Sequence, residues 1–283
     1  MSFPTRYTVA DLVREMGTYP PESAGATAIG SAGDGSVVYT DQLSTRANDH
    51  NVLMVAPAGH GKTNTLRGIA AQDLARGGSV LVVDSRVSGA SFRKVADLPN
   101  LMHGHRITAI HRLLTCLADE MAARAAALEA GVPAYMPLTV AVEGLDILKE
   151  LLSRHWMRLM PSGGPVVSPA LDALRLALFE GGPLDVRVIA TTQRPPSASW
   201  RDQFGVRVLG RQTRLGWDLL GCGEPLQPAM ARIPGRMHVV FGHDYAIETQ
   251  VPLWTDTAVR EWASRAVENQ PFPYLASTTW GDQ

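Results

Sequence analysis

The sequence predicts an α/β fold, in which helices cover both faces of a parallel β-sheet. Short, continuously apolar runs of strand length alternate with longer segments whose apolar residues recur at helical spacing. These runs do not alternate polar with apolar residues, which is typical of parallel strands buried on both faces. A glycine-rich loop also joins one of the runs to the helix that follows it. Strands that alternate with helices along a chain favour a parallel sheet.

The predicted elements begin after an N-terminal lead-in at residues 1–27. Residues 28–50 predict a β-hairpin with its turn at Asp34-Gly35. The first core strand covers 51–55, and an amphipathic helix over 63–76 follows it and ends at two glycines. The later elements are, in order, a strand over 79–84, a helix over 108–130, a strand over 138–142, a helix over 145–159, a helix from Ser168 as N-cap to Glu180, strands over 186–191 and 206–209, a helix over 214–220, a hairpin over 236–253 and a helix over 257–267.

Together these elements predict one α/β domain at residues 28–268, followed by a C-terminal tail at 269–283. Apolar residues make up 45% of the 283 residues, which is enough for a sizeable core. The formal net charge of -1 gives no support to a strongly basic nucleic-acid binder. Two cysteines do not indicate an oxidising compartment, and no signal peptide or bilayer-spanning run is evident. We therefore expect a soluble, cytoplasmic protein without a membrane segment of its own.

The loop over residues 56–63 reads Ala-Pro-Ala-Gly-His-Gly-Lys-Thr and lies between a predicted strand and a predicted helix. Such a loop wraps backbone N–H groups around the phosphates of a nucleotide. Lys62 is expected to reach the β- and γ-phosphates, and the Thr63 hydroxyl to ligate Mg²⁺, so ATP and Mg²⁺ are the predicted cofactors. Alanine replaces the first glycine of the pattern, at a turn that tolerates a methyl group. The predicted nucleotide-binding residues are Ala56, Pro57, Ala58, Gly59, His60, Gly61, Lys62, Thr63 and Asn64.

Several segments resemble the DNA-translocating ATPases typified by FtsK and SpoIIIE, with HerA as a wider relative. The similar segments are the hairpin and loop over 29–63, Leu81-Val-Val-Asp84-Ser85-Arg86 where the family usually ends Asp-Pro-Lys, Glu120-Met121 with Arg124, Ile189-Ala-Thr-Thr-Gln193-Arg194-Pro195, and the closing hairpin over 235–253. The resemblance covers residues 28–255. It implies a P-loop NTPase (RecA-like) sheet with helices on both faces and β-hairpin additions at both ends.

The segment after the predicted fourth strand carries a polar residue at its tip. In this class of folds that strand lies beside the loop-bearing strand, so Gln193 is expected to orient a water molecule or sense the γ-phosphate by hydrogen bonding. Arg194 has two open roles: it anchors the same loop or reaches toward DNA.

Hydrolysis in this class needs two acids after the third core strand, one for the Mg²⁺ water shell and one to polarise the attacking water. The sequence has Val142-Glu143-Gly144-Leu145-Asp146 where the family reads Asp-Glu. In one register Val142 replaces the metal-side acid and Glu143 is catalytic. In the other, Glu143 is the metal-side acid and Gly144 fills the catalytic position. The spacing to Asp146 favours the first register. Either register leaves one acid missing, so slower hydrolysis than in an intact relative is expected.

A ring ATPase takes an arginine from the neighbouring subunit. Arg207, Arg211 and Arg214 follow the fourth strand, and Arg207 best matches the family pattern. The predicted catalytic residues are therefore Lys62, Glu143, Gln193 and Arg207. His103-Gly104-His105 is interpreted as a loop, because no cysteine or carboxylate accompanies it.

The resemblance implies an ATP-driven translocase of double-stranded DNA that forms a homo-oligomer, a hexameric ring. One alternative is a nucleotide-dependent DNA clamp or assembly protein with little motor activity, which the incomplete acid pair favours. A small-molecule phosphotransferase is the other, but we find no arginine-rich substrate lid in the sequence.

Overall fold

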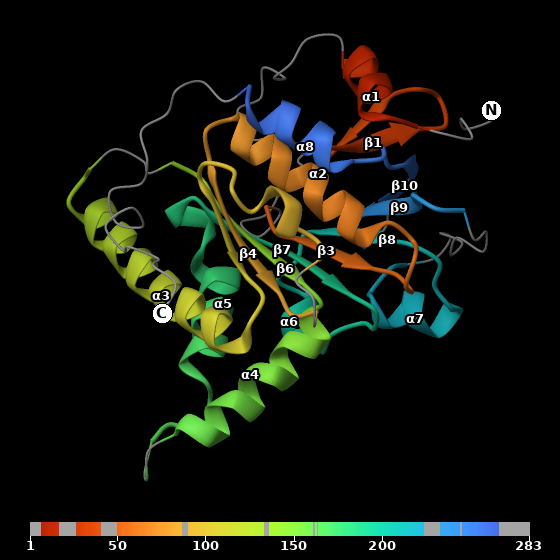
Figure 1. Ribbon diagram of the computed structural model, residues 1–283. Coiled ribbons are helices and arrows are strands. Elements are labelled where there is room, and N and C mark those ends of the chain that lie inside the picture. Colours follow the sequence, from red (N-terminus) through yellow and green to blue (C-terminus); the bar gives the residue numbers. More distant parts are fainter. Residues whose placement is uncertain are drawn as a thin grey trace.

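The computed structural model describes residues 7–16, 27–40, 50–86, 90–132, 136–160, 162, 164–223, 233–243 and 245–265. Over these ranges the chain forms one sheet with helices on both faces, which confirms the predicted α/β class (Figure 1). The predicted tail at 269–283 and most of the predicted lead-in lie outside the described residues. The division into lead-in, domain and tail stays a prediction.

Ten strands of the described residues make up the sheet, in the order β2-β1-β10-β9-β8-β3-β7-β6-β4-β5. The six strands from β8 to β5 are parallel, and β9, β10, β1 and β2 continue the sheet antiparallel. The strands are β1 (Ala28–Ala32), β2 (Val37–Tyr39), β3 (Val52–Val55), β4 (Ser79–Asp84), β5 (Leu101–Gly104), β6 (Leu138–Glu143), β7 (Val186–Thr192), β8 (Val206–Leu209), β9 (Arg236–Phe241) and β10 (Tyr245–Gln250).

Helices α2 and α8 lie over one face of the sheet, and α3, α4 and α5 lie over the other (Figure 1). The helices are α1 (Val9–Met16), α2 (Lys62–Ala75), α3 (Ile107–Glu129), α4 (Leu145–Leu159), α5 (Pro169–Glu180), α6 (Ala198–Arg201), α7 (Arg214–Leu219) and α8 (Asp256–Ala263), with 3₁₀ turns at Arg93–Val95 and Gly182–Leu184. Among the described helices, none is both long enough and apolar enough to cross a bilayer.

Strand β3 shows why the core strands read as continuous apolar runs. Val52 and Met54 pack with the residues of α2 on one face, while Leu53 and Val55 pack with those of α3, α4 and α5 on the other. Successive side chains of a strand point to opposite faces, so a strand covered on both faces needs apolar residues at every position.

The hairpins at the two ends of the chain join in the same sheet. Strand β1 pairs with β2 and with β10, and β10 pairs with β9, so the entry and closing hairpins are adjacent although about 200 residues separate them. This arrangement confirms the predicted β-hairpin additions at both ends. Leu12 of α1 is fully buried in the core beside this part of the sheet.

The interpretation of residues 103–105 as a loop was wrong in part. Leu101–Gly104 forms β5, which pairs in parallel with β4 at the edge of the sheet. Its signal was weak because an edge strand is buried less completely, so the run Leu-Met-His-Gly lacks the apolar continuity of the inner strands. The His103 ring is tilted against those of Phe92 and His105, with ring centroids 6.5 and 5.5 Å away.

Candidate nucleotide-binding site

The predicted phosphate loop lies between β3 and α2, at the carboxyl edge of the parallel strands. Gly61 has a φ of 92°, in the left-handed region, and it turns the chain into α2. The N–H groups of the first turn of α2 have no partner inside the helix and carry its positive dipole end. They border a cavity of about 370 Å³, which residues 58–64 line together with Arg86, Glu143, Asp146 and Gln193.

Lys62 lies folded along the loop. Its side chain is buried, and Nζ donates to the backbone oxygens of Ala56 at 2.5 Å and Pro57 at 2.9 Å. Burial lowers the pKa of the Lys62 ammonium, and the charges of Glu143 and Asp146 oppose this effect. The Lys62 ammonium therefore lies at the loop, where phosphate oxygens are expected.

Asn64 is the predicted binding residue whose side chain is most clearly engaged elsewhere. Its Nδ2 donates to the Pro252 carbonyl at 2.6 Å, and its Oδ1 accepts from the Trp254 N–H at 2.7 Å. These bonds fasten the start of α2 to the segment between β10 and α8. The side chain of Asn64 thus positions the loop, and its backbone N–H stays available for phosphate.

Glu143 ends β6 directly beside the phosphate loop, although 80 residues separate it from Thr63. The Thr63 hydroxyl donates to Glu143 Oε1 at 2.9 Å. Glu143 is buried, and its Oε2 has no hydrogen-bond partner. A hydroxyl and a carboxylate at this separation are oxygen ligands of the kind that hold Mg²⁺ and its water shell.

This contact bears on the two registers that the sequence leaves open for the acid pair. Thr139, Ala141 and Glu143 face α2: Thr139 bonds Asp73 of that helix at 2.7 Å, and Ala141 packs in its core. Val142 faces the opposite side, in the core with α3, α4 and α5. Because strand side chains alternate between faces, position 142 cannot reach the phosphate loop. Of the two positions, Glu143 is therefore the one on the side of the phosphate loop, which favours the second register.

Gly144 follows Glu143, and its backbone conformation disfavours a residue with a side chain. Its φ is +83°, and a Cβ would come within 2.7 Å of Ser85 Oγ. Its N–H donates to the Thr191 hydroxyl at 2.9 Å. A glutamate would be strained in this left-handed conformation. No sequence signal pointed to Thr191, because the contact depends on β7 lying beside β6.

Asp146, in the first turn of α4, is the other carboxylate on the cavity. Its Oδ1 is buried and has no hydrogen-bond partner. Asp84, at the end of β4, is fully buried and accepts from the Ser91 N–H at 3.2 Å and from the Ser91 hydroxyl. Asp84 is thus satisfied within the chain, whereas Asp146, like Glu143, has a buried oxygen without a hydrogen-bond partner.

Gln193 directly follows β7, which pairs with the loop-bearing β3. Its side chain is exposed and lines the cavity, as the position of the fourth core strand predicts. Arg194 is exposed beside it, and the Thr192 hydroxyl donates to its carbonyl at 2.9 Å. The loop is therefore held through the backbone of Arg194, which leaves its guanidinium in solvent.

Arg207 does not project as predicted. It lies within β8 beside Leu53 of β3, is 4% exposed, and donates from Nη1 to the Leu220 carbonyl at 2.7 Å. A guanidinium enclosed in its own chain cannot serve a neighbouring subunit in this conformation. Arg214 pairs with Asp218 at 3.1 Å, and Arg211 is exposed on the loop between β8 and α7. The structure therefore brings together Lys62, Thr63, Glu143 and Gln193 but not Arg207.

His60, a predicted nucleotide-binding residue of the loop, is 4% exposed. Its Nδ1 lies 3.1 Å from the Ala58 carbonyl, and its Nε2 is buried without a hydrogen-bond partner.

The Glu120–Arg124 pair of α3 has a structural role. Arg124 donates to Glu120 at 2.8 Å and also to the Leu184 carbonyl at 2.8 Å.

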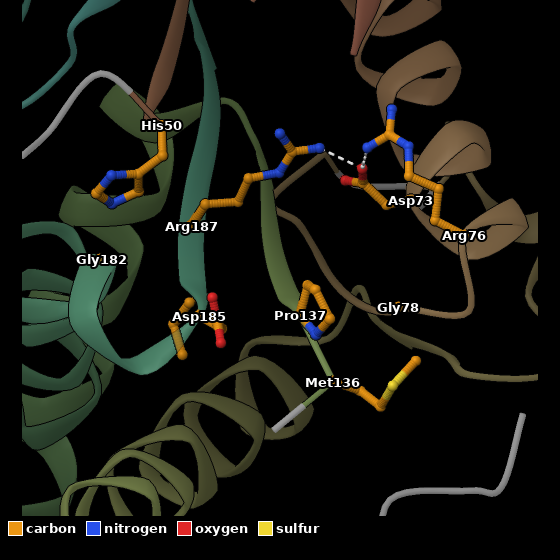
Figure 2. A pocket seen from close by; sticks show the side chains of 10 residues that line it. His50, Asp73, Arg76, Gly78, Met136, Pro137, Gly182, Asp185 and Arg187 are labelled. Atoms are coloured by element: carbon orange, nitrogen blue, oxygen red, sulfur yellow. Dashed lines mark hydrogen bonds and ion pairs between the residues drawn. The ribbon is translucent and has the colours of Figure 1, made fainter. Parts of the chain in front are cut away.

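A second cavity, of about 460 Å³, lies at the amino edge of the sheet, away from the phosphate loop (Figure 2). Asp73 of α2 accepts there from Arg187 of β7, from Arg76 at 3.2 Å and from Thr139 of β6 at 2.7 Å. Three donors on one carboxylate compensate its burial, so we interpret the cluster as a network that ties α2 to the sheet.

The parallel strand order, the loop after β3 and the acid at the end of β6 define a P-loop ATPase fold. Solved structures of ATPases superimpose on the chain and support this fold. No protein-family profile and no curated protein matches the sequence.

The matching structures include secretion and conjugation ATPases. EssC (ATPases 2 and 3) from Geobacillus thermodenitrificans superimposes with a TM-score of 0.66 at 18% identity, over 94% of this chain and 51% of that one. The cytoplasmic domain of the Thermomonospora curvata type VII secretion ATPase EccC gives 0.69 at 17%, over 95% and 35%. The pCW3 conjugation coupling protein TcpA gives 0.63 at 18%, over 93% and 75%. The chain spans about half the length of the EssC structure. At these identities the similarity establishes the fold.

The buried carboxyl of Glu143 predicts a pH effect on stability. Burial raises its pKa above the ordinary 4.5, while Arg86 and the Thr63 hydrogen bond oppose the rise. The folded state then binds this proton more tightly than the unfolded state, so the stabilisation is full below the ordinary pKa and is lost as pH rises through the raised value. As the pH rises above the ordinary pKa of 4.5, the melting temperature of the wild type should therefore fall more than that of Glu143→Gln. Parallel profiles would contradict this account.

Proposed function

We propose that this protein binds ATP with Mg²⁺ and hydrolyses it to move along double-stranded DNA. One observation carries the nucleotide part: Lys62, Thr63 and Glu143 converge on one cavity at the amino end of α2. The buried oxygens Glu143 Oε2 and Asp146 Oδ1, which have no hydrogen-bond partner, also border that cavity, as acids that serve a metal and a water molecule would.

The residues present fit a Mg²⁺–nucleotide. Lys62 and the first N–H groups of α2 bind the phosphates, the Thr63 hydroxyl ligates the metal, and Glu143 orients the metal's water shell. Bound Mg²⁺ supplies charge neutralisation at the phosphoryl oxygens. Gln193 is placed to hydrogen-bond the attacking water or the γ-phosphate.

Asp146 is proposed as the residue that accepts a proton from the attacking water, because Gly144 carries no acid. A positioned general base contributes roughly 10²- to 10⁴-fold to rate. Asp146→Asn should therefore lower the steady-state turnover of ATP by at least about tenfold and leave the dissociation constant of ADP nearly unchanged. Glu150→Gln, an exposed acid on the same helix, is the matched control. Turnover of Asp146→Asn equal to that of the control would remove Asp146 from this role.

Double-stranded DNA is proposed as the track because the fold is that of FtsK/SpoIIIE-type ATPases and TcpA is a conjugation coupling protein. Grip on the phosphate backbone is independent of sequence and needs cations only where the duplex passes. We propose the exposed Arg194 as one such cation.

We also propose a homo-oligomer, a hexameric ring, in which Arg211 rather than Arg207 reaches the neighbouring site. We expect the protein in the cytoplasm, where ATP and DNA are both present.

The test is ATP turnover with and without duplex DNA, together with displacement of a third strand from a triplex. A translocase should turn over faster with duplex DNA and should release the third strand only with ATP. A nucleotide-dependent clamp or assembly protein, our alternative, would bind ATP and DNA without displacing the strand.

A second candidate is movement of a polypeptide, which the type VII secretion ATPase EccC favours. The net charge of -1 also fits a partner other than nucleic acid. Turnover that duplex DNA leaves unchanged would favour this candidate over the translocase.

A further inference from the structure

Arg86 places a cation inside the nucleotide cavity from a strand that does not carry the phosphate loop. It follows β4, whose last residue, Asp84, lies opposite Glu143 of β6 in the sheet register. The guanidinium Nη2 lies 3.6 Å from Glu143 Oε1, and Nε lies 3.6 Å from Asp84 Oδ1. The side chain lines the same cavity as Lys62 and Thr63 and is 40% exposed. Arg86 thus lies beside Glu143, the acid that is proposed to serve the metal.

These contacts do not satisfy the hydrogen-bonding capacity of the Arg86 guanidinium. Charge-assisted hydrogen bonds between nitrogen and oxygen measure about 2.7–2.9 Å, and both ion pairs of Arg86 are longer at 3.6 Å. Its Nε is buried without a hydrogen-bond partner. Asp84 does not depend on the guanidinium, because Ser91 and the Arg86 backbone N–H already donate to it. The fork of Arg86 is therefore available to a stronger acceptor within the cavity.

A metal bound at Thr63 and Glu143 would change the electrostatic interactions of Arg86. The positive charge of Arg86 lies 3.6 Å from Glu143 Oε1 and so favours the carboxylate form of Glu143. Mg²⁺ bound beside Glu143 supplies the same support with two charges and repels the guanidinium. The planar fork of arginine matches phosphate oxygens and binds them in pairs. Lys62 and a metal would both serve the β- and γ-phosphates, and of these only the γ-phosphate distinguishes a triphosphate from a diphosphate.

We propose that Arg86 is the residue by which this site distinguishes a nucleoside triphosphate from a diphosphate. On triphosphate binding its guanidinium leaves Glu143 and donates to the oxygens of the γ-phosphate. The inference rests on the proposed nucleotide function. Position 86 is also where the sequence departs from the family's Asp-Pro-Lys, with an arginine in place of the lysine.

The test compares dissociation constants of Mg²⁺–ADP and of a non-hydrolysable Mg²⁺–ATP analogue, by calorimetry, for wild type, Arg86→Ala and Arg86→Lys. Arg86→Ala should weaken binding of the triphosphate analogue roughly 10- to 100-fold and change ADP binding by less than about twofold. Arg86→Lys keeps the charge but loses the fork, so it should fall between. Arg158→Ala, an exposed arginine of α4, is the matched control and should bind both nucleotides as the wild type does.

The outcomes separate the inference from the function on which it rests. If Arg86→Ala weakens both nucleotides equally, or neither, the assignment of the γ-phosphate to Arg86 is wrong while the nucleotide site stands. If the wild type binds neither nucleotide, both fall. A melting temperature measured for each variant distinguishes lost recognition from lost folding, because a purely structural role would lower stability without changing the preference for the triphosphate.

Discussion

Lys62→Ala is expected to weaken binding of Mg²⁺–ATP by roughly 100-fold. The buried ammonium is the cation nearest the loop, and a hydrogen bond between charged groups contributes about 1.5–3 kcal/mol. In the present structure the ammonium donates to two loop carbonyls, at 2.5 and 2.9 Å, so it is already held where phosphate is expected. Calorimetry with a non-hydrolysable ATP analogue measures the loss directly.

Lys94→Ala is the matched control for this variant. Lys94 is 76% exposed on the 3₁₀ turn and pairs with Asp256 at 3.4 Å, away from the cavity. It should bind the analogue as the wild type does. Unchanged affinity in Lys62→Ala would show that the loop at 56–63 does not hold the phosphates, and the nucleotide function would have to be abandoned.

Val142→Asp is expected to destabilise the protein by roughly 3 kcal/mol or more, and not to accelerate hydrolysis. Val142 is fully buried among apolar residues on the face of β6 away from the phosphate loop. A carboxyl group placed there gains no metal and has to be buried without a partner. The melting temperature should fall by about 5–10 °C.

Val142→Ala separates the two parts of this effect, because it loses packing but buries no polar group. It should lose less stability than Val142→Asp. A Val142→Asp protein that melts like the wild type and hydrolyses ATP faster would mean that position 142 faces the nucleotide, and the register of Glu143 would be reversed.

The loop-bearing unit could be predicted from sequence because each of its signals is local. The apolar run of β3, the glycines of the loop and the apolar spacing of α2 all lie within 25 residues. The same holds for β4, β6 and β7, whose inner residues are buried on both faces and are mostly apolar.

The acid pair shows where spacing alone fails. Counting back from Asp146 favoured Val142 as the metal-side position, but which face a residue takes depends on how the strand enters the sheet. The Thr63–Glu143 hydrogen bond and the Thr139–Asp73 hydrogen bond fix that face, and both join segments more than 60 residues apart. A one-residue change of register moves every side chain to the other face.

Arg207 and Arg86 were hard to place for a related reason. The local sequence does not show whether an arginine within a strand is buried or exposed. The carbonyls that accept from Arg207 come from the end of α7. Arg86 was visible only as a departure from the family's lysine. Its approach to Glu143 depends on β4 lying beside β6.

The position of a bound metal tests the central claim most directly. Crystals of the protein with Mn²⁺ and a non-hydrolysable ATP analogue would locate the ion by anomalous scattering. We predict an ion ligated by the Thr63 hydroxyl, with Glu143 beside its water shell and Val142 on the far face of β6. An ion bound away from Thr63 and Glu143, or phosphates outside the loop at 56–63, would contradict the account.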